Sequence, residues 1–259
     1  MKFDDLDRQM RRFELSFDRY LPTDQFTIAR LDGRSFTKLT KASLSFERPF
    51  DPRFHDGIIH TCRHLMDAGF QVAMCYTQSD EISLLLGKHD QVFQRKERKF
   101  VSILAGEASA AFSLAIGQRA SFDCRLCLMP AAENVIDYFR WRTEDARRNT
   151  LSAYCYWTLR AEGALPSEVD CRLSGLSVEE KRDLLRQRGI DLEAQDDWKR
   201  GGSFLWWEQY EHSGRNPVTG KDVATFRRRI TELPLPRDGD DLAAIVARAI
   251  AQMEDCAAS

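Results

Sequence analysis

The order of the expected strands and helices over residues 26–129 most restricts how this chain can fold. Short apolar runs at 26–31, 71–76, 82–86 and 121–129 are typical of strands, and helical periodicity covers about 53–67 and 91–116. The resulting order is strand, helix, strand, strand, helix, strand, which is the ferredoxin-like β-α-β-β-α-β arrangement. We therefore predict an α+β fold whose core sheet has the strand order 4-1-3-2.

Carboxylates stand at the ends of two of these strands. Asp32-Gly33 ends the first strand, and Asp80-Glu81 opens the third, after a five-residue connection over 77–81. In the order 4-1-3-2 the first and third strands are central, adjacent and antiparallel. We therefore expect the two carboxylate loci, about fifty residues apart in sequence, to meet at one edge of the sheet.

Carboxylates gathered at such an edge suit a magnesium site. Mg²⁺ binds through one or two carboxylates and fills its other positions with water and substrate phosphates. Two such ions about 4 Å apart can activate an attacking oxygen and neutralise a leaving pyrophosphate. Gly33 would let backbone groups approach the metal and a triphosphate. The same dipeptides also occur as ordinary turn residues, so both interpretations stay open at this point.

The composition indicates the compartment, the redox state of the cysteines and the possible partners of the protein. The sequence has no run of about 18 uncharged apolar residues and no apolar signal-peptide core, so we expect a cytoplasmic protein without a membrane span. Its seven scattered cysteines favour reduced thiols. The net charge of −2 leaves nucleic acid open as a partner, but basic clusters occur at 95–99, 147–148, 199–200 and 227–229.

The remaining segments complete the predicted organisation. Residues 4–20 have apolar side chains at spacings of three and four, which predicts an amphipathic helix. Beyond residue 130 we expect helices over 131–163, 167–174, 177–188 and 242–253, and strands over 204–210 and 223–230. The aromatic side chains of the 131–163 helix, Trp141 and Trp157 among them, are expected in the core. We divide the chain into a catalytic domain, 1–130, and a helical and β-hairpin extension, 131–259, packed on it as one compact unit.

Several motifs together resemble one family. Arg30-Leu-Asp-Gly-Arg-Ser-Phe36, followed by Gln78-Ser-Asp-Glu81, resembles the paired signature of the tRNA-His guanylyltransferases, which are reverse (3′-to-5′) polymerases. Further matching segments, in family order, are 46–51, 93–100, 122–125, 137–142, Asn149 with 156–157, and 199–203. The resemblance covers roughly residues 5–235. It implies the palm-like form of the ferredoxin fold that polymerases and nucleotide cyclases share.

The resemblance also implies a set of site residues. Two Mg²⁺ ions would be held by Asp32, the carbonyl of Gly33 and Asp80, with Glu81 as a further catalytic carboxylate. The nucleotide would be bound by Asp32, Gly33, Arg34, Ser35, Phe36, Thr37, Ser79 and Asp80, with Arg48 and Lys99 on its phosphates. The tRNA and its phosphates would contact Arg30, Arg147, Asn149, Lys181, Lys199 and Arg200.

The implied reaction extends the 5′ end of tRNA, using ATP and GTP or other nucleoside triphosphates, in a homotetramer. One departure is informative: Arg147-Arg-Asn-Thr-Leu-Ser-Ala153 stands where eukaryotic members have His-Ile-Asn-Asn-Leu-Tyr-Asn. This departure favours the bacterial and archaeal guanylyltransferase-like branch, which repairs truncated 5′ ends. The choice of tRNA and the preferred nucleotide stay open. Two alternatives remain: a palm-fold nucleotide cyclase, and a non-catalytic RNA-binding module, although the sequence has no RNP1 motif.

Overall fold

The computed structural model describes residues 2–40, 46–215 and 222–257. In chain order its elements are α1 (Phe3–Glu14), β1 (Phe26–Gly33), α2 (Phe36–Lys38), α3 (Pro52–Met66), β2 (Val72–Gln78), β3 (Glu81–Leu86), the 3₁₀-helix η2 (Val92–Arg95), α4 (Glu97–Ile116), β4 (Phe122–Met129), α5 (Ala132–Ala161), α6 (Pro166–Leu173), α7 (Val178–Arg186), α8 (Asp197–Gly201), β5 (Ser203–Arg215), β6 (Asp222–Leu233) and α9 (Gly239–Ala257).

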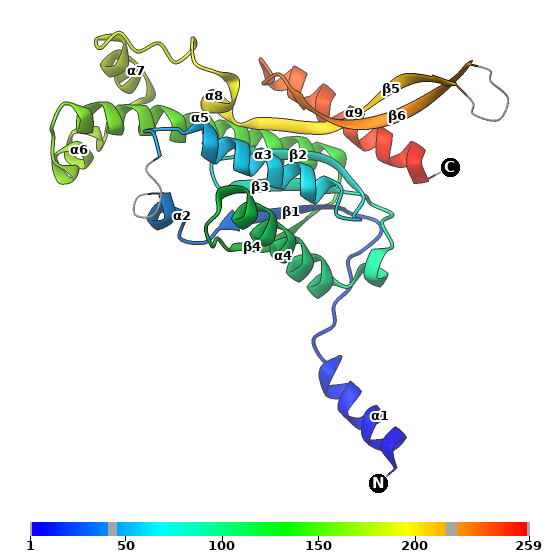
Figure 1. Ribbon diagram of the computed structural model, residues 1–259. Coiled ribbons are helices and arrows are strands. Elements are labelled where there is room, and N and C mark those ends of the chain that lie inside the picture. Colours follow the sequence, from blue (N-terminus) through cyan, green and yellow to red (C-terminus); the bar gives the residue numbers. More distant parts are fainter. Residues whose placement is uncertain (1, 41–45, 216–221, 258–259) are drawn as a thin grey trace.

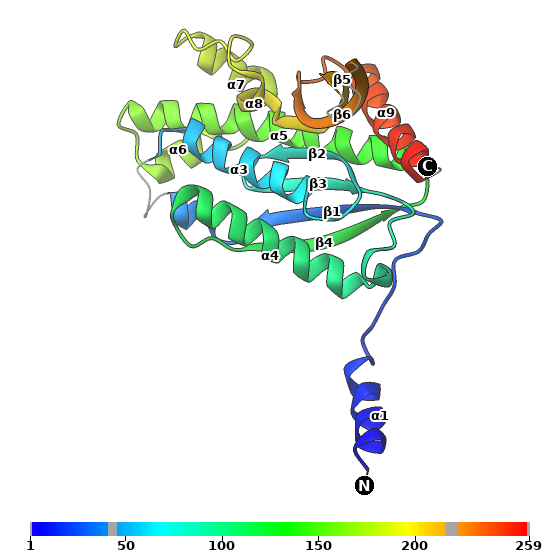
Figure 2. The same cartoon turned by 45° about the vertical axis from the view of Figure 1, so that its right-hand side comes forward.

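One antiparallel sheet runs through the molecule in the order β4-β1-β3-β2-β5-β6. The first four positions confirm the predicted order 4-1-3-2. The C-terminal hairpin of β5 and β6 then pairs with β2, so residues from both predicted parts share one sheet (Figure 1). Helices α3 and α4 cover one face, while α5 and α9 lie on the other (Figure 2).

Two apolar cores form because neighbouring side chains of a strand point to opposite faces of the sheet. Ala29 and Leu31 of β1 pack in the core under α3 and α4, whereas Ile28, between them, packs in the core with α5 and α9. The same alternation separates Cys124 from Cys127 on β4. Burying each large aliphatic side chain contributes about 1.5–3 kcal/mol, so the two cores hold the sheet between its helices.

The hairpin of β2 and β3 is tighter than the sequence predicts. Both strands continue into the expected five-residue connection, so that only Ser79 and Asp80 remain outside them. Ser79 takes a positive φ of 54°, a backbone conformation that two-residue hairpin turns commonly require. Likewise, β1 continues through Asp32 and Gly33, because both residues pair with β4. The carboxylates therefore stand on or beside paired strands instead of in loose loops.

The helices differ from expectation in three places. Helix α1 ends at Glu14, has no buried side chain and points away from the rest of the chain (Figure 1). The expected helix over 91–116 is split, because positive φ angles at residues 93–95 interrupt it before α4 begins. The short helices α2 and α8 were not predicted. By length and composition alone α4 could cross a membrane, but it packs in the core through Phe100, Leu104, Ala108, Ala111 and Phe112.

Gly202 marks the point where the chain enters β5, and its conformation demands a glycine. Its φ of 85° and ψ of −169° lie in a region that side chains essentially exclude, and an added Cβ would lie 2.4 Å from the carbonyl oxygen of Thr77. We predict that Gly202→Ala lowers the free energy of unfolding by at least about 3 kcal/mol. Urea denaturation measures this change.

Gly117 provides the matched control. It also has a positive φ, 67°, but an added Cβ would meet nothing within 4 Å. Gly117→Ala should therefore cost only about 1 kcal/mol, the ordinary penalty for a left-handed residue. Equal losses for the two variants would show that the contact with Thr77 contributes nothing.

Candidate active site

The expected meeting of the two carboxylate loci is confirmed by the strand register. Asp32 of β1 lies directly opposite Glu81 of β3, and the amide of Gly33 donates to the carbonyl of Asp80 over 3.0 Å. The turn residue Asp80 thus stands immediately beside the end of β1. Antiparallel pairing of two central strands therefore builds this edge, as the strand order requires.

Asp80 is a carboxylate with few positive neighbours. Ser79 donates from Oγ to its Oδ1 at 3.2 Å. Burial raises the pKa of Asp80 to about 6, and the negative charges of Asp32 and Glu81 add to the rise. Such a shift reports two unfavourable conditions for a negative charge, desolvation and repulsion. A bound cation at this position would relieve the repulsion.

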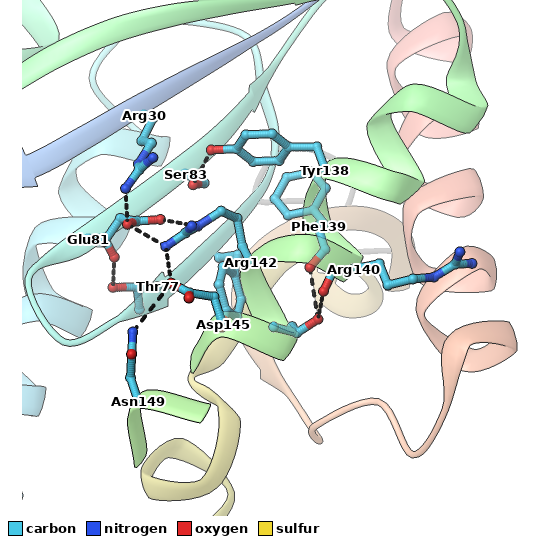
Figure 3. A network of polar contacts seen from close by, with 12 residues as sticks. Arg30, Thr77, Glu81, Ser83, Tyr138, Phe139, Arg140, Arg142, Asp145 and Asn149 are labelled. Atoms are coloured by element: carbon cyan, nitrogen blue, oxygen red, sulfur yellow. Dashed lines mark hydrogen bonds and ion pairs between the residues drawn. The ribbon is translucent and has the colours of Figure 1, made fainter. Parts of the chain in front are cut away.

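Glu81 is held in a different way, although it is adjacent in sequence. One oxygen accepts from Nη2 of Arg30 at 2.5 Å and from Nη2 of Arg142 at 2.7 Å, and the other accepts from Nε of Arg142 at 2.5 Å. Figure 3 shows both arginines converging on this carboxylate. Both of its oxygens are thus engaged by guanidinium groups. These guanidinium groups balance the charge of Glu81 and hold its side chain in one place.

The remaining donors fit magnesium. Asp32, Asp80 and the Gly33 carbonyl offer only hard oxygen atoms, and one or two carboxylates are what Mg²⁺ takes from a protein when phosphates complete its shell. Within the described residues, no group of three or more His, Cys, Asp or Glu side chains could hold a metal. This absence argues against a dedicated all-protein metal cage among the described residues.

Gly33 also lies too close to a neighbouring ring to carry a side chain of its own. An added Cβ would lie 2.5 Å from the ring of Phe36. That ring is buried and packs with Phe54, Phe112 and Phe122 in the core under α3 and α4. The glycine therefore lets the chain turn closely over the Phe36 ring, which anchors the loop after β1.

Two cavities flank Asp80. The aromatic cavity, of about 350 Å³, lies on the side of α3. Its walls include Phe36, Thr37, Phe46, Arg48, Phe50, Phe54, His55, Tyr156, Trp157 and Trp198. The polar cavity, of about 550 Å³, lies on the side of α5. Its walls include Arg30, Asp32, Glu81, Trp141, Arg142, Asp145 and Asn149. Both cavities share Gln78, Ser79, Asp80, Pro49 and Phe50.

The predicted nucleotide residues lie mostly around these cavities. Phe36, Thr37, Arg48, Ser79 and Asp80 line the aromatic cavity. The exposed residues Arg34 and Ser35 follow directly after Gly33, at the end of β1. Lys99 does not join them: β3 runs away from the carboxylate edge, and α4 begins at the opposite end of the sheet. The predicted topology already implied this position, because the third strand starts at the carboxylates and the following helix begins where that strand ends.

The predicted RNA-binding residues are divided among several places. Arg30 and Asn149 line the polar cavity. Arg147 and Arg200 line a third cavity, of about 610 Å³, together with Arg148, Arg182 and Arg237. The remaining two lie apart: Lys181 donates to Ser152, and Lys199 pairs with Asp196 at 2.8 Å. The structure therefore brings only two of the six to the carboxylate edge.

Sequence reasoning missed several residues of the site. His55 stacks on Trp198, with ring centres 4.3 Å apart, and burial lowers its pKa. Trp157, which was expected in the core, is only partly buried and lines the aromatic cavity, with the guanidinium of Arg48 4.9 Å from its ring centre. Trp141 is 54% exposed at the polar cavity, so its expected place in the core was wrong. A helical spacing of three and four residues along 138–149 was the available signal for the α5 residues around Glu81.

The buried ion pair of Arg142 and Glu81 generates a stability prediction. Their side chains are only 8% and 12% exposed, so Arg142→Met leaves Glu81 with a single charged partner in a poorly hydrated place. We expect the free energy of unfolding to fall by about 3–5 kcal/mol, since loss of one partner leaves an undercompensated charge. Urea denaturation of the single variants and of Arg142→Met with Glu81→Gln measures the coupling.

Arg140 is the matched control on the same helix. Its ion pair with Asp137 is largely exposed, with side chains 49% and 66% accessible. Arg140→Met should change the free energy of unfolding by less than about 0.5 kcal/mol. If both variants lose the same stability, or if the double variant is simply additive, the pair does not hold this edge together.

Comparison with known proteins supports this architecture. Residues 7–130 match the family described as tRNAHis guanylyltransferase, and residues 133–233 match the Thg1 C terminal domain. The tRNA(His) guanylyltransferase of Debaryomyces hansenii is 28% identical over 211 residues, covering 75% of this chain and 79% of that protein. The enzyme of Schizosaccharomyces pombe is 29% identical over 199 residues, covering 73% and 75%.

Solved structures agree on the fold. A bacterial Thg1-like protein in complex with ATP superposes with a TM-score of 0.69 at 27% identity, covering 78% of this chain and 88% of the other. A second, in complex with GTP, gives a TM-score of 0.72 at 24% identity, covering 93% and 99%. The palm-like fold expected from the sequence is therefore confirmed. This chain belongs to the tRNAHis guanylyltransferase family.

Proposed function

We propose that this protein is a Mg²⁺-dependent tRNA nucleotidyltransferase, which adds nucleotides to the 5′ end of tRNA in the 3′-to-5′ direction. The observation that carries the proposal is the place of Asp80 between two cavities of different chemistry. A transfer between two substrates needs such a shared centre. Family membership and the printed names of the relatives, tRNA(His) guanylyltransferases, support tRNA as the acceptor.

The residues at the edge of the sheet near Asp80 have different proposed roles. Asp32, Asp80 and the Gly33 carbonyl would hold Mg²⁺, which when bound neutralises charge on the transferring phosphoryl group. Arg48, Ser79, Phe36 and Thr37 line the aromatic cavity and, with the adjacent residues 33–35, would bind the triphosphate of the nucleotide. Aromatic rings suit its base, because every base offers a face for stacking. ATP and GTP in the bacterial Thg1-like structures support nucleoside triphosphates as ligands.

The proposed reaction proceeds in two balanced steps. The 5′-phosphate oxygen of the RNA first attacks the α-phosphorus of ATP, which forms an adenylylated 5′ end and releases pyrophosphate. The 3′-hydroxyl of the incoming nucleotide then attacks the RNA 5′-phosphorus, loses its proton and displaces AMP. An RNA that already has a 5′-triphosphate skips the first step and releases pyrophosphate in the second. Positive charge near both phosphorus atoms stabilises the developing charge.

The proposal also includes the choice of tRNA, the oligomeric state and the compartment. Residues 147–153 lack the leading histidine of the eukaryotic segment, which supports templated repair of truncated 5′ ends over strict tRNA-His specificity. The family resemblance further supports a homotetramer, and we propose the cytoplasm as its compartment.

Loss of one metal ligand tests the reaction directly. The substrate is a tRNA lacking its first 5′ nucleotide, supplied with labelled nucleoside triphosphates and Mg²⁺. We predict that Asp80→Asn lowers the rate of incorporation at least about 100-fold, because it removes several kcal/mol of charge stabilisation. Asp137→Asn, on the exposed surface of α5, should incorporate label at the wild-type rate.

Two results would refute the proposal. Equal incorporation by Asp80→Asn and wild type would remove the metal site from the chemistry. Release of pyrophosphate by the wild type without any RNA, with a cyclic nucleotide as product, would assign the protein to the nucleotide cyclases instead.

The pKa of Asp80 predicts how Mg²⁺ binding depends on pH. Without metal the folded protein raises this pKa from 3.8 to about 6, so the protonated form contributes stability that is complete below pH 3.8 and is lost as the pH rises through 6. Mg²⁺ binds only the ionised form and competes with that proton. We therefore expect the Mg²⁺-induced rise in Tm to be small at pH 5 and to reach its full value by pH 7.5.

Thermal denaturation with and without Mg²⁺ measures this dependence. The Asp80→Asn side chain cannot ionise. In this variant the Mg²⁺-induced rise in Tm should therefore be smaller than in wild type, and it should not change as the pH passes through 6. A wild-type response that is constant from pH 5 to 7.5 would contradict the assignment of Asp80 as a ligand.

A further inference from the structure

We propose that Trp141 is the platform on which the 5′-terminal base of the RNA substrate stacks. The inference rests on the proposed function and assigns a position to the acceptor end of the RNA. Trp141 lies on α5 and lines the polar cavity together with Asp32 and Asp80. An RNA base resting on this indole would therefore lie beside the proposed metal site.

The exposure of Trp141 sets it apart from its neighbours. Its side chain is 54% exposed, whereas Tyr138 and Arg142 on the same helix are buried. Indole surface left in water at the wall of a cavity can be covered by a ligand ring. The 5′-terminal base of an acceptor stem has one exposed π-face, because no further base lies beyond it, and such a face can stack on an aromatic side chain.

The indole is also held in a defined orientation. The guanidinium of Arg142 lies 4.6 Å from its ring centre, that of Arg30 lies 6.0 Å away, and Tyr138 contacts it edge-to-face at 6.0 Å. Both guanidiniums are in turn held by hydrogen bonds to Glu81. A ring held in place loses little conformational freedom when a base stacks on it.

The charges of the cavity favour a base over a phosphate as the group next to Trp141. Four carboxylates face the cavity, Asp32, Asp80, Glu81 and Asp145, against the two guanidiniums of Arg30 and Arg142. The excess of negative charge repels phosphate until Mg²⁺ is bound. An uncharged base meets no such repulsion, and it can stack on the exposed indole.

A second tryptophan on α5, Trp157, can be compared directly with Trp141. Trp157 lines the aromatic cavity, with Arg48 placed 4.9 Å from its ring centre. Each cavity beside Asp80 thus has a tryptophan of α5 with an arginine beside its ring. The smaller aromatic cavity suits the base of the incoming nucleotide, and the larger polar cavity suits the end of an RNA.

The test uses a tRNA lacking its first nucleotide and having fluorescent 2-aminopurine as the new 5′-terminal base. Stacking on an indole quenches this fluorophore, so wild type should quench it on binding. Trp141→Ala should abolish the quenching and raise the Kd for the RNA about 10-fold, a change of about 1.4 kcal/mol that lies within the range of one stacked base. Trp141→Phe should retain part of the quenching and part of the affinity for the RNA.

Two comparisons separate stacking from a structural role. An RNA with an abasic 5′-terminal position should bind wild type and Trp141→Ala with equal Kd. Trp157→Ala should give the reverse pattern, with a raised KM for the nucleotide and unchanged quenching of the RNA probe.

The results that overturn the inference are distinct from those that refute the reaction. Full quenching by Trp141→Ala, in a preparation whose wild type incorporates nucleotide, removes the stacking role and leaves the reaction intact. If Trp141→Ala raises the Kd equally for abasic RNA and for RNA with a 5′-terminal base, Trp141 acts only by packing against Arg142. That result would also overturn the inference. Failure of the wild type to incorporate any nucleotide would instead refute the proposed function.

Discussion

The antiparallel pairing of β1 with β3 is the constraint on which the rest of the structure depends. Its register sets Asp32 opposite Glu81 and brings the backbone of Gly33 onto the carbonyl of Asp80. A shift by one residue would turn every side chain of the strand to the other face of the sheet, which would place core residues in water. Apolar side chains on both faces therefore hold the carboxylates in place.

Adjacent carboxylates acquire different roles from their surroundings. Asp80, in the turn, has no guanidinium partner among the described residues, and burial raises its pKa, so it suits a cation. Glu81, one residue later on the strand, is enclosed by Arg30 and Arg142 and serves as a support. The same environmental logic separates paired carboxylates in many active sites. Here the division depends on α5, which supplies Arg142 from 61 residues further along the chain.

Helix α5 connects the parts of the proposed machinery. Its 30 residues pass from the polar cavity, at Trp141 and Asn149, to the aromatic cavity, at Trp157. Another face of the same helix presents Arg147 and Arg148 to the third cavity. One long, rigid element can thus fix the distance between a nucleotide, an RNA end and further phosphates, which is what a transfer reaction between two large substrates requires.

The sequence alone determined the order of the first four strands of the sheet and the meeting of Asp32 with Glu81, because periodicity and chain connectivity restrict these features. It also indicated the family through motifs that stand in order along the chain. Only the tertiary structure decided that Glu81 is held by two arginines, that Lys99 lies at the far end of the sheet, and that Trp141 is exposed. Those outcomes depend on how α4 and α5 pack against the sheet, and such long-range packing leaves no periodic signal in the residues themselves.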